Sequence, residues 1–138
     1  MVTPALPLGG HCLCGDVRFE IRGAPGPAGA CHCESCRRWS GTYWSSVNIA
    51  QSDLVLTSGE ASLAWYPSSE HAERGFCLLC GSSLFWRLSA ADSERVAVAI
   101  GALDLPTGLD LSAHIFTGEA GDTYEVPQGA PHHEGFPQ

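Results

Sequence analysis

The sequence Cys31-His32-Cys33-Glu34-Ser35-Cys36 contains three cysteines within one short segment. A pair lies on either side of it, Cys12-Leu13-Cys14 and Cys77-Leu78-Leu79-Cys80, so all seven cysteines of the chain fall into three clusters. Two, three and two thiolates are the numbers required for one closed four-thiolate metal site and one three-thiolate site with an open position. A closed zinc site builds structure, whereas an open site can take part in chemistry.

The cysteine spacings suit metal ligation. Side chains at positions i and i+2 of an extended segment project from the same face, with α-carbons about 6.6 Å apart, and this applies to Cys12 with Cys14 and to Cys31 with Cys33. The last pair has the two-residue gap of a zinc knuckle and is followed by Gly81, which permits a tight turn. Spacing alone does not decide which pairs share an ion. Iron–sulfur ligation is an alternative, although the usual ferredoxin spacings are missing.

Composition restricts the partners and the compartment. The seven basic residues, all arginine, are outnumbered by 15 acidic ones, and the formal charge of −8 argues against nucleic acid as a partner. The first residues do not resemble a signal peptide, and no apolar stretch approaches the ~20 residues that cross a bilayer. We therefore expect a cytoplasmic protein with no membrane partner. In that reducing compartment, clustered cysteines are more often metal ligands than disulfides.

The remaining sequence predicts a mainly β fold of short antiparallel strands and hairpins with one short helix. Val17, Phe19 and Ile21 alternate with polar residues, which is the pattern of a strand with one solvent-facing side. Further strands are expected over residues 43–49, 54–57, 63–66, 83–87, 95–100 and 114–117. The helix is expected from Glu34 to Ser40, and it would place the last cysteine of the central cluster one turn beyond the second.

The length of 138 residues predicts one domain with a single core. We expect a single zinc-binding domain over residues 1–138, with the motifs in about residues 9–120. The tail over residues 121–138 contains several prolines and no periodicity, so it should be irregular and lie over the surface. The sequence does not indicate an oligomeric state.

Three motifs give a more specific indication. They are Gly10-x-Cys12-x-Cys14-Gly15-x-Val17, Cys31-His32-Cys33-x-x-Cys36-Arg37-Arg38-x-Ser40-Gly41 and Phe76-Cys77-x-x-Cys80-Gly81-Ser82-x-Leu84. Together they resemble the glutathione-dependent formaldehyde-activating family, which includes centromere-protein-V-like members. Gly101-Ala102-Leu103-Asp104 and His114-Ile115-Phe116 are similar to later segments of that family, so the resemblance covers about residues 9–120 in order.

The resemblance implies a β-rich fold that carries two zinc ions, one structural and one labile and catalytic. The first and last cysteine pairs correspond to the family's structural zinc site, which here would consist of Cys12, Cys14, Cys77 and Cys80. The central cluster corresponds to its catalytic zinc site, which here would consist of Cys31, Cys33 and Cys36. Glutathione is the co-substrate that the family name implies.

Three thiolates around a zinc ion favour a thiol substrate. The centre would have a formal charge of −1, so it would acidify a bound water less than a centre with three neutral histidines does. A soft, sulfur-rich centre instead favours another soft ligand, such as a substrate thiol. The thiolate would attack formaldehyde or a comparable small aldehyde to give an S-hydroxymethyl adduct, and the reverse step cleaves a carbon–sulfur bond. We therefore expect a carbon–sulfur lyase similar to S-(hydroxymethyl)glutathione synthase, with a non-enzymatic zinc-binding interaction module as the alternative.

Residues next to the central cluster are candidates for substrate binding. Arg37 and Arg38 follow it directly, and a guanidinium can hold one of the two glutathione carboxylates bidentately. With Gly41 they are the expected substrate-binding residues, although a solvated helix face or pairing with Glu34 is the alternative for the arginines. His32 should point away from its flanking cysteines, and a hydrogen-bonded structural role is expected for it in preference to a fourth ligand or a base.

Overall fold

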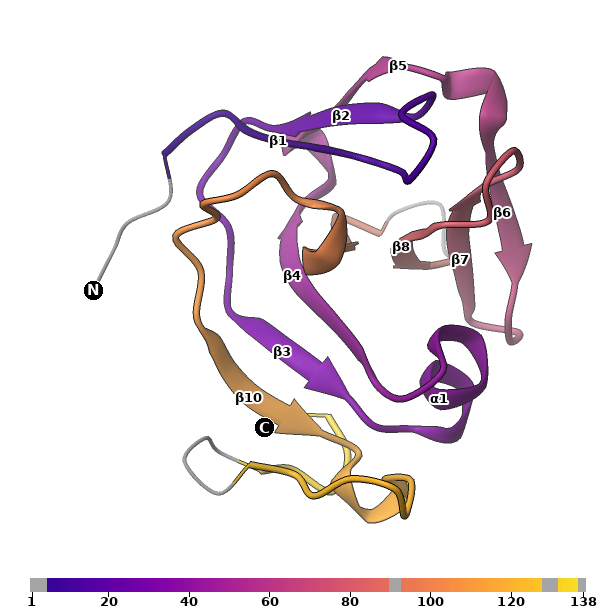
Figure 1. The fold of residues 1–138 in the computed structure, drawn as a ribbon, viewed down its shortest axis with the longest axis vertical. Helices are drawn as coiled ribbons and strands as arrows, with labels where there is room; N and C mark the ends of the chain where they lie inside the picture. Colours follow the sequence, from indigo (N-terminus) through magenta and orange to yellow (C-terminus); the bar gives the residue numbers. More distant parts are fainter. Residues whose placement is uncertain (1–4, 90–92, 128–131, 137–138) are drawn as a thin grey trace.

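The computed structural model describes residues 5–89, 93–127 and 132–136, which contain ten strands and one α-helix (Figure 1). The helix is α1 (Glu34–Ser40), and the strands are β1 (Leu8–His11), β2 (Arg18–Ile21), β3 (Ala28–Cys31), β4 (Trp44–Ala50), β5 (Leu54–Ser58), β6 (Leu63–Pro67), β7 (Ala72–Cys77), β8 (Ser83–Leu88), β9 (Arg95–Ala99) and β10 (Leu111–Ile115). One sheet has the order β1-β2-β5, and the other has the order β10-β3-β4-β9-β8-β7-β6. The mainly β fold expected from the sequence is therefore confirmed.

The main hydrophobic core joins the two sheets. Phe19 of β2 and Phe85 of β8 meet edge to face, with ring centroids 5.2 Å apart. Ile21 is also buried, while Arg18 is exposed, as the alternating pattern of this strand predicts. Each large apolar side chain that is fully buried in such a core contributes roughly 1.5–3 kcal/mol. The β1-β2-β5 sheet thus packs on the larger sheet instead of forming a separate unit.

Most expected strands occur within one or two residues of their predicted bounds, but β1, β3 and β7 were missed. The sequence of β3 is Ala-Gly-Ala-Cys, which has little intrinsic strand preference. It becomes a strand because it lies between β4 and β10. The sequence of β1 contains Gly9 and Gly10, and a Cβ atom at Gly10 would lie 2.5 Å from the Phe19 ring. Tertiary packing therefore makes these segments strands. The local sequence pattern carries no signal for this packing.

The last strand differs most from the prediction. It covers Leu111–Ile115 instead of residues 114–117, and β10 pairs with β3 in parallel although antiparallel pairs were expected (Figure 1). After β10 the chain passes through a 3-10 turn at Thr117–Glu119. Residues 120–127 and 132–136 contain no helix or strand beyond one isolated bridge of His132. Within the described ranges, no helix is long and apolar enough to cross a bilayer.

The helix α1 has the predicted bounds, and its ends have clear causes. The Cys33 side chain occupies the N-cap position and accepts a hydrogen bond from the Cys36 backbone N–H. At the other end Gly41 adopts a left-handed conformation with φ of 106°, and its N–H donates to the Arg37 carbonyl. Since Cys31 ends β3, Cys33 caps α1 and Cys36 lies in its first turn, the central cysteine cluster spans the junction of strand and helix.

Candidate metal centres and the adjoining cavity

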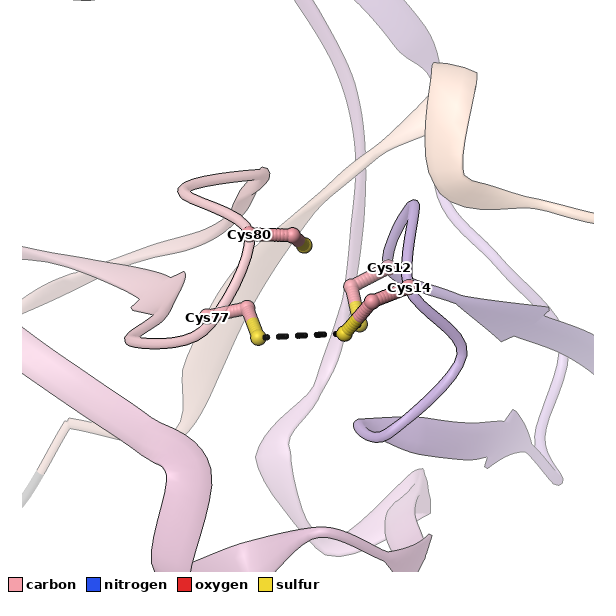
Figure 2. A group of neighbouring side chains, drawn as sticks. All are labelled: Cys12, Cys14, Cys77 and Cys80. Carbon is pink, nitrogen blue, oxygen red and sulfur yellow. Dashed lines mark hydrogen bonds between the residues drawn. The ribbon is translucent and has the colours of Figure 1, made fainter.

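Two loops bring four cysteines together. Cys12 and Cys14 lie in the connection between β1 and β2, and Cys77 and Cys80 lie at the turn between β7 and β8 (Figure 2). All four sulfur atoms lie within 4.8 Å of one another. The structure therefore brings the first and last cysteine pairs together, and their shared site connects the two sheets.

The donor set of this four-cysteine cluster fits zinc. Zinc–sulfur bonds of about 2.3 Å in a tetrahedron place the sulfur atoms ~3.8 Å apart. Here the Cys12 and Cys14 sulfurs are 3.5 Å apart, and the Cys14 and Cys77 sulfurs are 3.9 Å apart. The Ser82 hydroxyl lies 3.2 Å from the Cys80 sulfur and lowers the pKa of Cys80 to about 5, which favours the thiolate form of this one residue.

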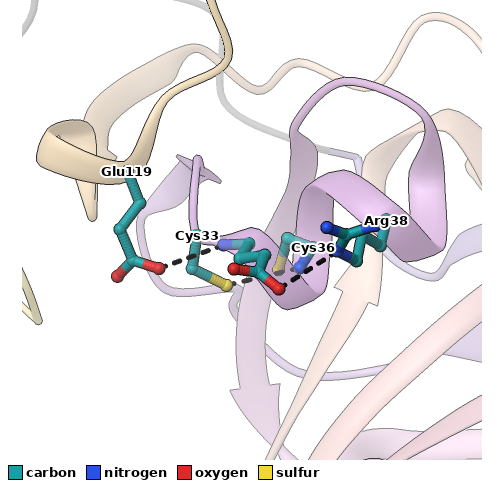
Figure 3. A network of polar contacts seen from close by, with 5 residues as sticks. Cys33, Cys36, Arg38 and Glu119 are labelled. Carbon is teal, nitrogen blue, oxygen red and sulfur yellow. Dashed lines mark hydrogen bonds and ion pairs between the residues drawn. The ribbon is translucent and has the colours of Figure 1, made fainter.

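The central cysteines form a second cluster. The sulfur atoms of Cys31, Cys33 and Cys36 lie within 4.8 Å of one another, and no fourth His, Cys, Asp or Glu ligand atom joins them among the described residues. Figure 3 shows Cys33 and Cys36 at the first turn of α1. We call these three residues the sulfur tripod. Their donor chemistry fits a zinc ion with one position left for another ligand.

Crowding of the tripod sulfurs favours a thiolate on the central one. A hydrogen bond from the Cys31 thiol lowers the pKa of Cys33 to about 2, and the same bond raises the pKa of Cys31. The positive charge of Arg74 also lowers the pKa of Cys33. Since metals bind the thiolate form, a tripod that already carries negative charge is prepared for a cation.

The tripod forms part of the wall of a cavity of about 750 Å³, a size typical of small-molecule sites. Much of the lining is apolar, with Trp44 and Trp86 from the large sheet and Phe116 from the segment after β10. Polar side chains also line it, among them Asn48, Arg74, several serines and two glutamates. A cavity with apolar walls and several polar groups next to a cluster of thiols suits a small thiol-containing ligand.

Comparison with known proteins gives the family. The family model described as glutathione-dependent formaldehyde-activating enzyme matches residues 7–119. The chain belongs to this family. The match includes both cysteine clusters and all ten described strands, so the resemblance noted from the motifs is confirmed.

Individual proteins are also similar to large parts of the chain. Over 104 residues it is 30% identical to a protein of Halomonas elongata whose name assigns it provisionally to the glutathione-dependent formaldehyde-activating enzymes, with 70% of this chain and 66% of that protein covered. Over 77 residues it is 32% identical to an uncharacterized lyase of Schizosaccharomyces pombe, with 56% and 55% covered. The matched part thus spans only about half to two thirds of the length of these curated relatives. A crystal structure of a Rhodobacter sphaeroides protein is similar with a TM-score of 0.56 and 28% identity, covering 70% of this chain and 87% of that one.

Within this family member, the expected substrate-binding residues lie beside the tripod but not in the cavity lining. Arg37, Arg38 and Gly41 are not among the residues that line it. Arg38 pairs with Glu34 at 3.0 Å, and both side chains are mostly exposed, which is the alternative that the sequence left open (Figure 3). On the other side, Glu119 accepts a hydrogen bond from the Glu34 backbone N–H. The first turn of α1 is thus in contact with the segment after β10.

Arg74 was not predicted as a site residue from the sequence. This residue of β7 is only 4% exposed, and both of its terminal nitrogens lie 3.6 Å from the Cys36 sulfur. Its guanidinium also lies 4.8 Å from the centre of the Trp39 ring. The only sequence signal was a charged residue three positions before Cys77, and β7 itself was not predicted. Arg74 lines the cavity next to the tripod.

His32 is not part of the metal cluster. Its ring is fully buried, with Nδ1 2.7 Å from the Tyr124 hydroxyl and Nε2 2.9 Å from Nδ1 of His114. Burial lowers the pKa of His32, and the charge of His114 lowers it further, so the ring stays neutral and hydrogen-bonded. The structural role expected for this histidine agrees with these contacts. Through Tyr124, the C-terminal segment is attached to the tripod loop.

Replacing Tyr124 with phenylalanine should destabilise the protein by about 1–3 kcal/mol, because the buried Nδ1 of His32 would lose its partner. Thermal unfolding measures this effect as a lower Tm. The matched control is Tyr66→Phe, which removes a hydroxyl from a side chain that is 59% exposed and should leave Tm unchanged. Equal Tm values for the two variants would show that the Tyr124–His32 contact contributes nothing.

Proposed function

We propose that this protein is a zinc-dependent carbon–sulfur lyase that forms and cleaves the adduct of a glutathione-like thiol with formaldehyde or a similar small aldehyde. One observation carries the proposal: three cysteine sulfurs converge at a cavity, and no fourth side-chain ligand completes the cluster among the described residues. Membership of the formaldehyde-activating family supports the substrate class. The names of the relatives, a lyase and a formaldehyde-activating enzyme, support the reaction type.

The two cysteine clusters would each hold one zinc ion. A zinc ion on Cys31, Cys33 and Cys36 would supply a fourth position at which a substrate thiol loses its proton. A free thiol with a pKa of about 8.5 is only ~3% thiolate at pH 7, so complete deprotonation raises the concentration of the nucleophile up to about thirtyfold. Holding the thiol and the aldehyde together can add considerably more.

The cavity would position the substrate and exclude water. Trp44, Trp86 and Phe116 provide apolar walls, which favour a dry site around the reacting groups. Asn48 offers both a donor and an acceptor to the peptide groups of a glutathione-like molecule. Arg37, Arg38 and Gly41 remain proposed contacts for carboxylate parts of the substrate that extend beyond the cavity.

Exchange NMR of a mixture of glutathione and formaldehyde tests the reaction. With the protein present, free glutathione and its S-hydroxymethyl adduct should interconvert at least ~10-fold faster than without it, because the thiol is deprotonated and held near the aldehyde. The same concentration of a variant that lacks one tripod thiolate is the control. If the native protein gives the rate of the uncatalysed mixture, the proposed reaction is wrong.

A non-enzymatic interaction module is the second candidate. The tips of the two loops that form the four-cysteine cluster expose large apolar side chains, with Leu13 85% exposed, Leu78 60% and Leu79 69%. Such residues on metal-binding loops suit protein contact. Metal analysis separates the two candidates, because an enzyme should hold one of two zinc ions in a form that glutathione can reach. Two zinc ions that are both tightly bound and unaffected by thiols would favour the module.

A further inference from the structure

Arg74 is a buried cation whose only described polar contacts are with sulfur. Its side chain is 4% exposed, and its two terminal nitrogens both approach the Cys36 sulfur at 3.6 Å. No carboxylate pairs with it among the described residues. By contrast, Arg87 on the neighbouring strand β8 pairs with Glu73 at 2.6 Å. An arginine side chain stays protonated in proteins, and burying a charge without a partner has a large free-energy cost. The buried position of Arg74 therefore requires negative charge nearby.

The tripod provides part of that charge. Three thiolates and one divalent cation would sum to −1, which the guanidinium balances. The Cys36 sulfur accepts one hydrogen bond from each terminal nitrogen of Arg74, whereas a guanidinium has five N–H donors. Three donors therefore have no protein acceptor among the described residues. Since Arg74 also lines the cavity, it can offer hydrogen bonds to a ligand seated next to the sulfurs.

We propose that Arg74 stabilises the oxygen of the aldehyde during carbon–sulfur bond formation and cleavage. In the forward direction the substrate sulfur donates an electron pair to the carbonyl carbon, and the carbon–oxygen π electrons move to oxygen. Arg74 holds this oxyanion by charge-assisted hydrogen bonds until the oxygen takes a proton from water. In the reverse direction the hydroxyl returns its proton to water, the carbonyl forms again, and the carbon–sulfur bond breaks with its electron pair on sulfur. This role rests on the function proposed above.

The location of Arg74 favours the reacting oxygen over a substrate carboxylate. The guanidinium touches a tripod sulfur directly, so it lies beside the point where a thiol sulfur would enter. The oxygen of an S-hydroxymethyl adduct is separated from sulfur by a single carbon. In a glutathione-like thiol, at least one whole peptide unit separates the sulfur from either carboxylate. A carboxylate on Arg74 would therefore draw the thiol away from the tripod.

Kinetics of Arg74→Ala and Arg74→Lys, each with glutathione and with mercaptoethanol, test this role. The alanine variant should lose about 100-fold in kcat with both thiols, with little change in KM, because one oxyanion donor is worth about that much. Added guanidinium ion should restore part of the rate. The control is Arg87→Ala, which removes a partly buried arginine that stacks on Trp65 outside the cavity and should keep kcat. A loss confined to glutathione, or an unchanged kcat, overturns the proposal.

Binding gives a readout that does not depend on turnover. Mercaptoacetate carries an anionic oxygen close to its sulfur, whereas mercaptoethanol carries a neutral one. The native protein should bind mercaptoacetate at least ~10-fold more tightly, and Arg74→Lys and Arg74→Ala should lose most of this preference. If the preference is present while formaldehyde exchange is not accelerated, the proposed reaction fails and recognition of an anionic oxygen stands. The proposal is wrong if the native protein accelerates exchange but shows no preference for mercaptoacetate. It is also wrong if both Arg74 variants lose one metal equivalent, because Arg74 would then only stabilise the tripod.

Discussion

Cys77→Ser is expected to leave the protein largely unfolded and insoluble. A structural zinc site contributes ~10–16 kcal/mol, which equals or exceeds the whole stability of a typical small domain. Cys77 is fully buried and belongs to the cluster that joins the β1–β2 connection to the β7–β8 turn. Without one of its four ligands, the contact between the two sheets would lose this connection. The soluble fraction, the circular dichroism spectrum and Tm measure the outcome.

The control for this experiment is Cys36→Ser, which removes an equally buried sulfur from the tripod. The tripod residues lie close together in sequence at the end of β3 and the start of α1, so they close no long loop. We expect this variant to stay folded and soluble while it loses one zinc equivalent. Equal losses of solubility in Cys36→Ser and Cys77→Ser would contradict the division into a structural and a catalytic site.

Cys33→Ser is expected to reduce the catalysed exchange at least ~100-fold and to remove one of two zinc equivalents, while Tm falls only slightly. Serine is among the best N-cap residues, so it preserves the cap that Cys33 provides for α1 and removes only the thiolate. With two remaining sulfurs, the tripod would no longer hold the ion that deprotonates the substrate thiol. Metal analysis, Tm and exchange NMR on the same sample measure the three effects.

Two outcomes would contradict this expectation. A variant that retains both zinc ions and full exchange would show that Cys33 is not a ligand of the reactive site. A variant that loses the fold together with the metal would show that the tripod is structural. Ser35→Ala is a matched control, because Ser35 lies on the same helical turn and belongs to neither cysteine cluster. It should leave the metal content and Tm unchanged.

Strong local signals in the sequence predicted the parts of the fold that depend on local interactions. The bounds of α1 follow from its capping residues, and the buried side of β2 follows from alternating residues. By contrast, β3 and β10 form a parallel pair whose partners lie about 80 residues apart, as in the pairing of His114 with Ala30. The short side chains of β3 carry no signal for this pairing. Only the assembled sheet gives them a strand conformation.

The candidate site was predictable where the ligand type itself is informative. The cysteines are grouped in sequence, and the structure brings each group together. Arg74 was not predictable, because a charged residue at a buried strand position interrupts the apolar pattern by which strands are recognised. The same interruption concealed β7. The contact of His32 with Tyr124 was also invisible, because it joins residues that are 92 positions apart.

The four-cysteine cluster joins residues that are far apart in the sequence, which bears on when it can form during synthesis. Cys14 and Cys77 are separated by 63 positions, so the ion's binding site does not exist until more than half of the chain has emerged from the ribosome. Closing so long a loop has an entropic cost that binding of the ion must offset. An ion bound here would therefore be captured only after both cysteine pairs have been synthesised, and it would then help to fix the β1-β2-β5 sheet on its larger neighbour.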